Sequence, residues 1–174
     1  MSRDEYRRWA EETGQRAERV GGEVIAMAPE RAVHNRVKAN VYAALKDAIR
    51  TGGLACEAFT DGMTIEVDDD TDYEPDAVVR CGQPLDDNAT VVPDPIIVVE
   101  VSSPSTRAGD TGNKLADYFR VVSVQHYLIV RADRRQVIHH RRGEGRIETH
   151  ILTEGNVLLD PPGFRVGVAE FYAS

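Results

Sequence analysis

An acidic residue interrupts the most apolar segment of the chain. Glu100 lies in IIVVEV, residues 96–101, whose other five members are aliphatic and β-branched. That composition is typical of a central strand covered on both faces, where an unpaired charge costs several kcal/mol. A divalent cation, a lysine or an array of backbone donors could compensate it, and the first two are components of hydrolytic metal sites. Glu100 is therefore the first candidate for a catalytic residue.

A second carboxylate stands at a comparable position. Asp76 follows Pro75 directly and opens the apolar segment DAVV. Taken alone, it is also compatible with an aspartate that caps a turn. If one sheet edge holds both acids, then Asp76, Glu100 and a backbone carbonyl, that of Val101, could share one ion. Such oxygen ligands suit Mg²⁺ or Mn²⁺ better than zinc, which favours histidine and cysteine.

A cation is available on the segment that follows. Asp110, Lys114 and Tyr118 are four residues apart in GDTGNKLADYF, which is helical by its spacing, so they share one helix face. That face could turn toward the carboxylates, with Lys114 as the catalytic cation. The alternative is an exposed ion pair between Asp110 and Lys114, worth only about 0.3–0.5 kcal/mol.

The elements that must position these residues alternate between helices and strands. Ser2 and Glu5 have the spacing of a capping box for a first helix that ends near Gly14. The pair Gly21 and Gly22 predicts a hairpin turn. Apolar residues recur every fourth position over 33–49, which predicts a long helix. The predicted strands are AERV, EVIAMA, LACEAF, MTIEV, DAVV and IIVVEV before the Lys114 helix, and HYLIV, QVIHHR and RIETHIL after it. This order favours an α/β fold with a mixed sheet and helices on its faces.

Composition limits the class of protein. The 174 residues fit a single globular domain, residues 1–174. No apolar run approaches the ~20 residues of a membrane-spanning helix, so we expect a cytoplasmic protein without a membrane partner. Cys56 and Cys81 form no CxxC pair, and we expect buried small side chains instead of a disulfide. His126, His139, His140 and His150 show no zinc-ligand spacing.

Charge is distributed unevenly. The net charge is −8, which argues against a protein that coats nucleic acid nonspecifically. Segment 57–76 holds nine acidic residues and neither lysine nor arginine, whereas 131–146 holds six arginines and two acidic residues. The arginine-rich segment could meet phosphates or could be a solvated hairpin. The candidates for nucleic-acid contacts are Arg134, Arg135, Arg141 and Arg142.

Most of the chain also resembles a known family. The motifs are YEPD at 73–76, VVEVSSPSTRAGDTGNKLADYF at 98–119, GGEVIAMAPERAVHNRV at 21–37 and HYLIV at 126–130. Together they resemble the Uma-two family of restriction-endonuclease-like proteins, within the PD-(D/E)XK nuclease superfamily. The resemblance implies a restriction-endonuclease-like core of four strands in a mixed sheet, flanked by helices, with additional antiparallel strands.

The same resemblance assigns roles to individual residues. It implies that Asp76 and Glu100 are metal ligands, that Lys114 is the active lysine, and that His34 and Glu23 face the site. His34 by itself is more often a surface residue. In the superfamily's commoner pattern the lysine stands two residues after the glutamate, but that position is Ser102 here. Either the lysine has moved to the helix or the activity has been lost.

These observations predict a Mg²⁺- or Mn²⁺-dependent endonuclease that hydrolyses DNA, or less readily RNA. The ion would polarise the scissile phosphate and activate a water, and Lys114 would stabilise developing negative charge. Because duplex cleavage needs two sites, a homodimer is expected. Two alternatives remain open: a catalytically inactive module of the same fold that binds nucleic acid or a protein partner, and an unrelated metal-dependent hydrolase of a small phosphorylated substrate.

Overall fold

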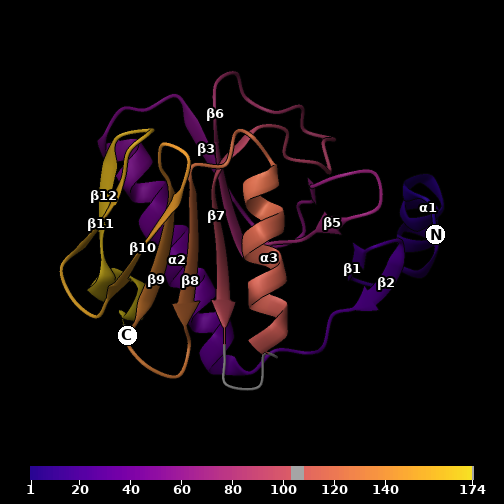
Figure 1. The fold of residues 1–174 in the computed structure, drawn as a ribbon, viewed down its shortest axis with the longest axis horizontal. Coiled ribbons are helices and arrows are strands. Elements are labelled where there is room, and N and C mark those ends of the chain that lie inside the picture. Colours follow the sequence, from indigo (N-terminus) through magenta and orange to yellow (C-terminus); the bar gives the residue numbers. More distant parts are fainter. Residues whose placement is uncertain (103–107, 174) are drawn as a thin grey trace.

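The computed structural model describes residues 1–102 and 108–173, without the side chains of residues 108–111. Its central feature is a mixed six-stranded sheet with the order β10-β9-β8-β7-β6-β3 (Figure 1). The bounds of these strands are β3 Cys56–Thr60, β6 Ala77–Cys81, β7 Pro95–Ser102, β8 His126–Arg131, β9 Val137–Arg142 and β10 Ile147–Leu152. The sheet is thus wider than the expected four-stranded core, and the strand that carries Glu100 lies inside it.

Two helices cover opposite faces of this sheet. Helix α2 (Ala32–Thr51) packs on one face, and α3 (Ala108–Arg120) lies on the other (Figure 1). The strands β7 and β8 are parallel, and α3 connects them, as a parallel pair requires. Side chains of β7 alternate between the two cores: Val99 belongs to the cluster around α2, and Val98 to the cluster around α3. Glu100 therefore points to the α3 side. None of the described helices is both long and apolar enough to cross a membrane.

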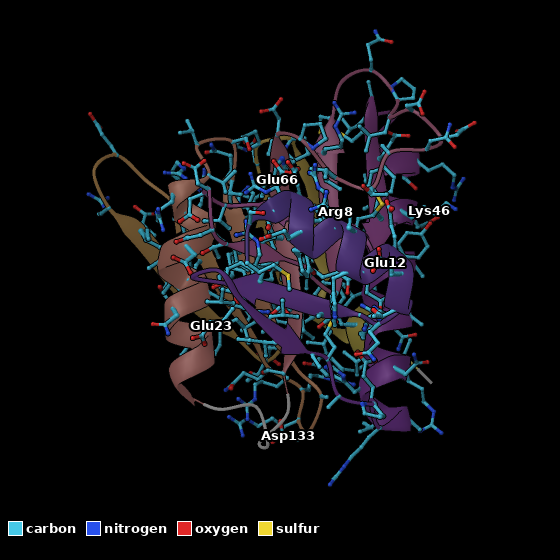
Figure 2. The ribbon with its side chains drawn as sticks, turned by 90° about the vertical axis from the view of Figure 1, so that its right-hand side faces the viewer. Arg8, Glu12, Glu23, Lys46, Glu66 and Asp133 are labelled. Carbon is cyan, nitrogen blue, oxygen red and sulfur yellow. A yellow bond between two sulfur atoms is a disulfide. The ribbon has the colours of Figure 1, made fainter. Side chains whose placement is uncertain are left out.

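A smaller sheet has the order β2-β1-β5-β4 and lies beside α3. Its strands are β1 Ala17–Val20, β2 Glu23–Ala26, β4 Ile65–Glu66 and β5 Asp72–Tyr73, and helix α1 (Arg3–Thr13) packs next to it. Figure 2 shows α1 running alongside the β1–β2 hairpin, with Arg8 and Glu12 on its exposed side. The capping box of Ser2 and Glu5 is present, and Gly21 and Gly22 close the hairpin with positive φ angles of 58° and 76°.

The C-terminal part adds elements that the apolar pattern did not predict. Strands β11 (Asn156–Leu159) and β12 (Phe164–Gly167) form an antiparallel pair, followed by the 3-10 helix η1 (Val168–Tyr172). Their buried side chains, such as Leu159 and Phe171, join the core around α2. Strand β5 was also not predicted, because it has only two residues and lies among acidic ones.

The acidic segment 57–76 is held by basic residues from other parts of the chain. Arg19 and Asp72 form a buried pair, each with 1% of its side chain exposed, at 2.7 Å. Other pairs are Arg7–Glu66, Arg16–Asp61, Arg16–Glu74, Arg80–Glu57 and Arg120–Asp68. Most acidic side chains of segment 57–76 therefore form intramolecular ion pairs, and the segment is not a single solvated acidic surface.

The prediction for the two cysteines was wrong. Cys56 and Cys81 form a disulfide. They stand directly opposite each other in the antiparallel pair β3–β6, where side chains on the same face are close. Because 25 residues separate them, no local spacing motif signals the contact.

Candidate functional site

Glu100 lies at the C-terminal end of β7 and meets two side chains from α3. Lys114 Nζ lies 3.0 Å from Glu100 Oε1, and the Tyr118 hydroxyl donates a hydrogen bond of 2.7 Å to the same oxygen. Lys114 and Tyr118 reach it together because four residues on a helix make little more than one turn. The helix face expected to turn toward Asp76 and Glu100 thus contacts Glu100. Asp110, at the preceding turn of that face, has a side chain outside the described part.

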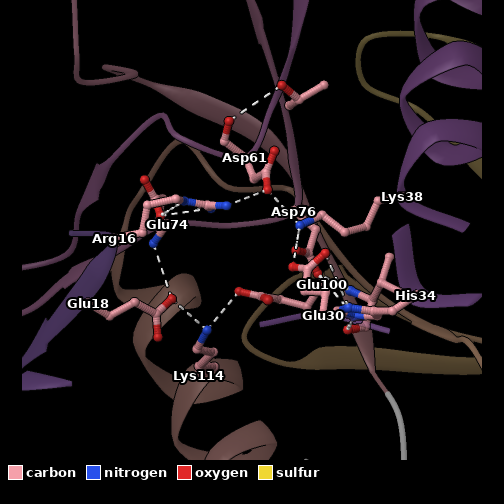
Figure 3. Close-up of polar contacts among 12 residues, drawn as sticks. Arg16, Glu18, Glu30, His34, Lys38, Asp61, Glu74, Asp76, Glu100 and Lys114 are labelled. Carbon is pink, nitrogen blue, oxygen red and sulfur yellow. Dashed lines mark hydrogen bonds and ion pairs between the residues drawn. The ribbon is translucent and has the colours of Figure 1, made fainter. Parts of the chain in front are cut away.

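A third element completes the environment of Lys114. Its Nζ also lies 2.8 Å from Glu18 Oε1, on β1 of the smaller sheet. The ammonium lies over the ring of Tyr73, 4.9 Å from the ring centre. Lys114 thus stands between two carboxylates from different sheets, with 12% of its side chain exposed (Figure 3). Sequence reasoning gave no signal for Glu18, since the contact spans 96 residues.

Burial controls the ionisation of this group of side chains. It raises the pKa of Glu100 to about 7, helped by the negative charges of Asp76 and Glu18 and opposed by Lys114 and the Tyr118 hydrogen bond. Burial disfavours the charge on Lys114, but the carboxylates of Glu100 and Glu18 outweigh it and raise its pKa. Burial and the Glu100 charge also raise the pKa of Tyr118. The carboxylates of Glu100 and Glu18 thus keep Lys114 protonated, and Lys114 counters the effect of burial on Glu100.

Asp76 is fixed on both of its carboxylate oxygens. Oδ2 accepts a hydrogen bond of 2.6 Å from the backbone N–H of Val101, and Oδ1 lies 2.9 Å from Lys38 Nζ. The first contact places Asp76 beside the residue that follows Glu100. Asp76 is thus part of the site's structure at the start of β6, and its side chain is 6% exposed.

His34 lies in the first turns of α2 and reaches the same strand end. Its Nε2 donates to the backbone carbonyl of Val101, since a carbonyl can only accept. The same nitrogen is 4.0 Å from Asp76 Oδ2, and Nδ1 is 3.6 Å from Glu30 Oε2. The carbonyl expected to be a metal ligand therefore already has a hydrogen-bond partner, and its second lone pair remains for another contact.

Sequence reasoning missed Lys38, which stands one helical turn after His34. Its ammonium contacts Asp76, Glu30 and Asp61, and Asp61 also pairs with Arg16 (Figure 3). Burial opposes the charge on Lys38, but the nearby carboxylates, Asp76 first, raise its pKa. The i, i+4 spacing of His34 and Lys38 was a signal that could have found it.

The donor set is compatible with magnesium. Asp76 and Glu100 offer carboxylate oxygens, and Mg²⁺ commonly uses one or two carboxylates with waters and substrate phosphates for its remaining positions. Glu100 Oε2 makes no hydrogen bond or ion pair with another described residue. Across the described residues, no group of three or more His, Cys, Asp or Glu side chains is arranged to hold a metal ion. Asp76 and Glu100 thus offer the oxygen ligands that Mg²⁺ or Mn²⁺ takes in proteins.

The four arginines expected to contact phosphates do not form one surface. Arg134 and Arg135 are exposed in the turn between β8 and β9, at the sheet edge where β7 ends, because Ser102 pairs with Arg131 in register. Figure 2 shows Asp133 of this turn at one end of the molecule. Arg141 pairs with His126, which in turn pairs with Ile97, so it lies toward the opposite edge.

Arg142 also binds backbone carbonyls at the C-terminal end of α3. Its guanidinium donates to the carbonyls of Phe119, Val121 and Val124 and lies 5.2 Å from the centre of the Phe119 ring. These carbonyls lie at and just beyond the C-terminal end of α3, where helices leave acceptors without intrahelical partners.

Glu23 pairs with Val20 in the hairpin, so its side chain lies on the same face as that of Glu18. It is exposed at the start of β2 (Figure 2) and makes no hydrogen bond or ion pair with the described residues of the site. The carboxylate that the hairpin brings to the site is Glu18, on the other strand, where Glu18 pairs with Ile25.

Comparisons with known proteins bear on the fold and the family of this chain. Two uncharacterised proteins of Synechocystis sp. (strain ATCC 27184 / PCC 6803 / Kazusa) are 28% and 27% identical to the chain over 148 and 141 residues. The alignments cover 83% and 79% of this chain and 76% and 78% of theirs. The crystal structure of "a putative nuclease belonging to DUF820" from Anabaena variabilis ATCC 29413 superimposes with a TM-score of 0.73. It is 16% identical, and the match covers 91% of this chain and 90% of that one, so the two share a fold.

A sequence model of the Uma2 family, described as "Putative restriction endonuclease", matches residues 3–171. That range contains the six-stranded, the four-stranded and the two-stranded sheet, helices α1, α2 and α3, and every residue of the site described above. The chain therefore belongs to the Uma2 family of putative restriction endonucleases.

Proposed function

We propose that this protein is a Mg²⁺-dependent endonuclease that hydrolyses phosphodiester bonds of DNA. The observation that carries the proposal is the contact of Lys114 with Glu100 at the end of β7, with Asp76 directly before the neighbouring strand β6. Two carboxylates and a protonated lysine at one sheet edge are the components that phosphodiester hydrolysis requires. Membership of a family described as restriction endonucleases supports nuclease chemistry.

Each residue has a distinct part in the proposed reaction. Asp76, Glu100 and the Val101 carbonyl would hold Mg²⁺ or Mn²⁺, which supplies charge neutralisation and an acidified water. Lys114 offers its charge to the oxygens on which negative charge develops. Tyr118 fixes the orientation of Glu100, and His34 fixes the Val101 carbonyl. On the same edge, Arg134 and Arg135 are available to the backbone phosphates.

The DNA substrate implies a second copy of the chain. Cleavage of both strands needs two sites, and a domain with a net charge of −8 has few cations with which to grip a duplex alone. We therefore propose a homodimer as the active form. Sedimentation at tens of micromolar tests it, and a monomer there would contradict it.

One observation favours a second function. Both expected metal ligands already carry a lysine, Lys38 on Asp76 and Lys114 on Glu100, and Ser102 holds the commoner lysine position. The same pairing of lysines with carboxylates is expected in a module of this fold that binds nucleic acid or a protein without cutting it. The third alternative, a hydrolase of a small phosphorylated substrate, is not favoured, because it would give Arg134 and Arg135 no role.

A nuclease assay separates these possibilities. Plasmid DNA, single-stranded DNA and RNA are incubated with the protein in Mg²⁺, in Mn²⁺ and in EDTA, beside Glu100→Gln as the matched control. The proposal expects cleavage of DNA that needs a divalent ion and is absent from the control. Retention of plasmid without cleavage in either ion would favour the binding module.

A further inference from the structure

Lys38 occupies a place that the proposed reaction does not explain. It lies on the face of α2 that packs against the sheet, among the apolar residues Val37 and Val41, and only 6% of its side chain is exposed. An ammonium in such a place costs several kcal/mol unless partners compensate it. Its partners should therefore show what this lysine does.

Three carboxylates hold the ammonium. Lys38 Nζ lies 2.6 Å from Glu30 Oε1, 2.7 Å from Asp61 Oδ2 and 2.9 Å from Asp76 Oδ1. An ammonium has three N–H donors, so each donor has an acceptor. Glu30 precedes α2, Asp61 follows β3 and Asp76 precedes β6, so the contacts converge from three separate segments. An arrangement of three carboxylates around a central positive charge is otherwise typical of a bound cation.

The size of this arrangement matches an ammonium. Its three N···O distances exceed the 2.0–2.1 Å of Mg²⁺–oxygen bonds by roughly half to one ångström. If the lysine were lost, the carboxylates would be free to close around an ion.

Nucleases of the two-metal type place two ions about 3.5–4 Å apart, joined by shared carboxylates. Here one oxygen of Asp76 is committed to Lys38. We propose that Lys38 is a positioning residue whose ammonium takes the place of a second divalent cation beside Asp76, so that the site accepts a single metal ion. The inference rests on the proposed function, because it takes Asp76 to be a ligand of that ion.

Metal stoichiometry tests the proposal, since a merely structural lysine would not alter it. Mn²⁺ is titrated calorimetrically into the wild type, Lys38→Met, Lys38→Arg and Lys46→Met, which removes an exposed lysine of the same helix (Figure 2). We expect one ion per chain in the wild type, Lys38→Arg and Lys46→Met, and one more in Lys38→Met. An unchanged stoichiometry in Lys38→Met would overturn the proposal.

Loss of the lysine could also unfold the chain, because it leaves the three carboxylates to repel one another. Thermal unfolding of Lys38→Met with increasing Mn²⁺ then gives the answer. A melting temperature that rises with Mn²⁺ more than that of Lys46→Met supports the proposal. A variant that stays unfolded at saturating Mn²⁺ counts against it, because the ion then fails to replace the ammonium.

Glu100→Gln separates this proposal from the proposed function. If that variant loses Mn²⁺ while Lys38→Met binds like the wild type, only the role of Lys38 is wrong. If the wild type binds no Mn²⁺, the proposed function fails. The role of Lys38 then fails with it, because that role takes Asp76 to be a ligand of the first ion.

Discussion

Lys114 Nζ lies 3.0 Å from Glu100 Oε1, although the lysine is on a helix and the glutamate is 14 residues earlier on a strand. Ser102, two residues after Glu100, is buried, and its hydroxyl has no hydrogen-bond partner among the described residues. The positive charge of this site is thus supplied by α3 and not by the strand of the glutamate. This relationship determines which variants should affect cleavage.

Glu100→Gln should abolish metal-dependent cleavage and leave the fold in place. Glutamine keeps the volume and can still accept the Tyr118 hydrogen bond, while Lys114 keeps Glu18 as a partner. The change removes the ligand charge on which Mg²⁺ affinity depends. Calorimetric titration with Mg²⁺ and circular dichroism give the two readouts. Equal Mg²⁺ affinity in the variant and the wild type would end the claim that Glu100 is a ligand.

Lys114→Ala should lower the cleavage rate by about 10²–10³, the usual effect of removing one charge-stabilising group. The melting temperature should also fall, because Glu100 and Glu18 lose the cation between them. Adding Ser102→Lys should restore part of the activity, since it returns a lysine to the strand. The exposed Lys46→Ala is the control. Full activity in Lys114→Ala would favour the noncatalytic module.

Replacing Arg134 and Arg135 by alanine should reduce the salt dependence of DNA binding. Two lost phosphate contacts lower the log–log slope by about 1.8 for duplex DNA. Alanine at Arg141 and Arg142 should leave the slope unchanged, because they lie toward the opposite sheet edge, but should lower the melting temperature through the carbonyls that Arg142 binds. Binding isotherms between low and physiological salt measure both slopes. Equal slopes in the wild type and the first variant would show that this turn does not touch DNA.

Acid should destabilise the protein through a buried histidine pair. His126 Nδ1 lies 2.9 Å from His139 Nε2, and burial lowers the pKa of His126 to about 4 and, with the charges of neighbouring histidines, that of His139 to about 3. In the unfolded chain both histidines protonate near pH 6.5. The free energy of unfolding that the neutral pair contributes is therefore fully present above that pH and is lost as the pH falls toward 3.

His139→Gln isolates this effect, since glutamine is neutral throughout. The loss of unfolding free energy between pH 7 and pH 5 should shrink by about 2 kcal/mol relative to the wild type. Urea unfolding of the variant and the wild type at the two pH values measures it. A pH dependence that His139→Gln leaves unchanged would show that the pair does not govern it.

Local patterns predicted the elements that carry the site. A carboxylate inside a β-branched run identified β7 and Glu100, and four-residue spacing placed Lys114 and Tyr118 on one helix face. The helix α2 followed from its apolar period, yet Val33, counted in that period, is exposed, whereas Lys38 lies in the buried stripe. A buried lysine breaks an apolar pattern in the same way as a surface residue, so the apolar pattern alone could not show that Lys38 is buried.

Contacts between distant segments could not be predicted. Cys56 meets Cys81 because β3 and β6 are aligned in register. Glu18 meets Lys114 because β1 of the small sheet lies beside α3. Neither contact has a local signal in the sequence. The division of the arginine-rich segment has the same cause. Six residues of β9 carry its two halves to opposite edges of the sheet, a separation that charge counting does not detect.

The contact between Lys114 and Glu18 has a dynamic consequence. It is an ionic link between α3 on the large sheet and β1 of the small sheet, so the hairpin formed by β1 and β2 is fastened to the candidate site itself. Backbone amides of residues 17–26 should then exchange with deuterium at rates that depend on what occupies the site. The deuterium exchange rates of this hairpin would therefore show whether the site is occupied, without any measurement of nucleic-acid cleavage.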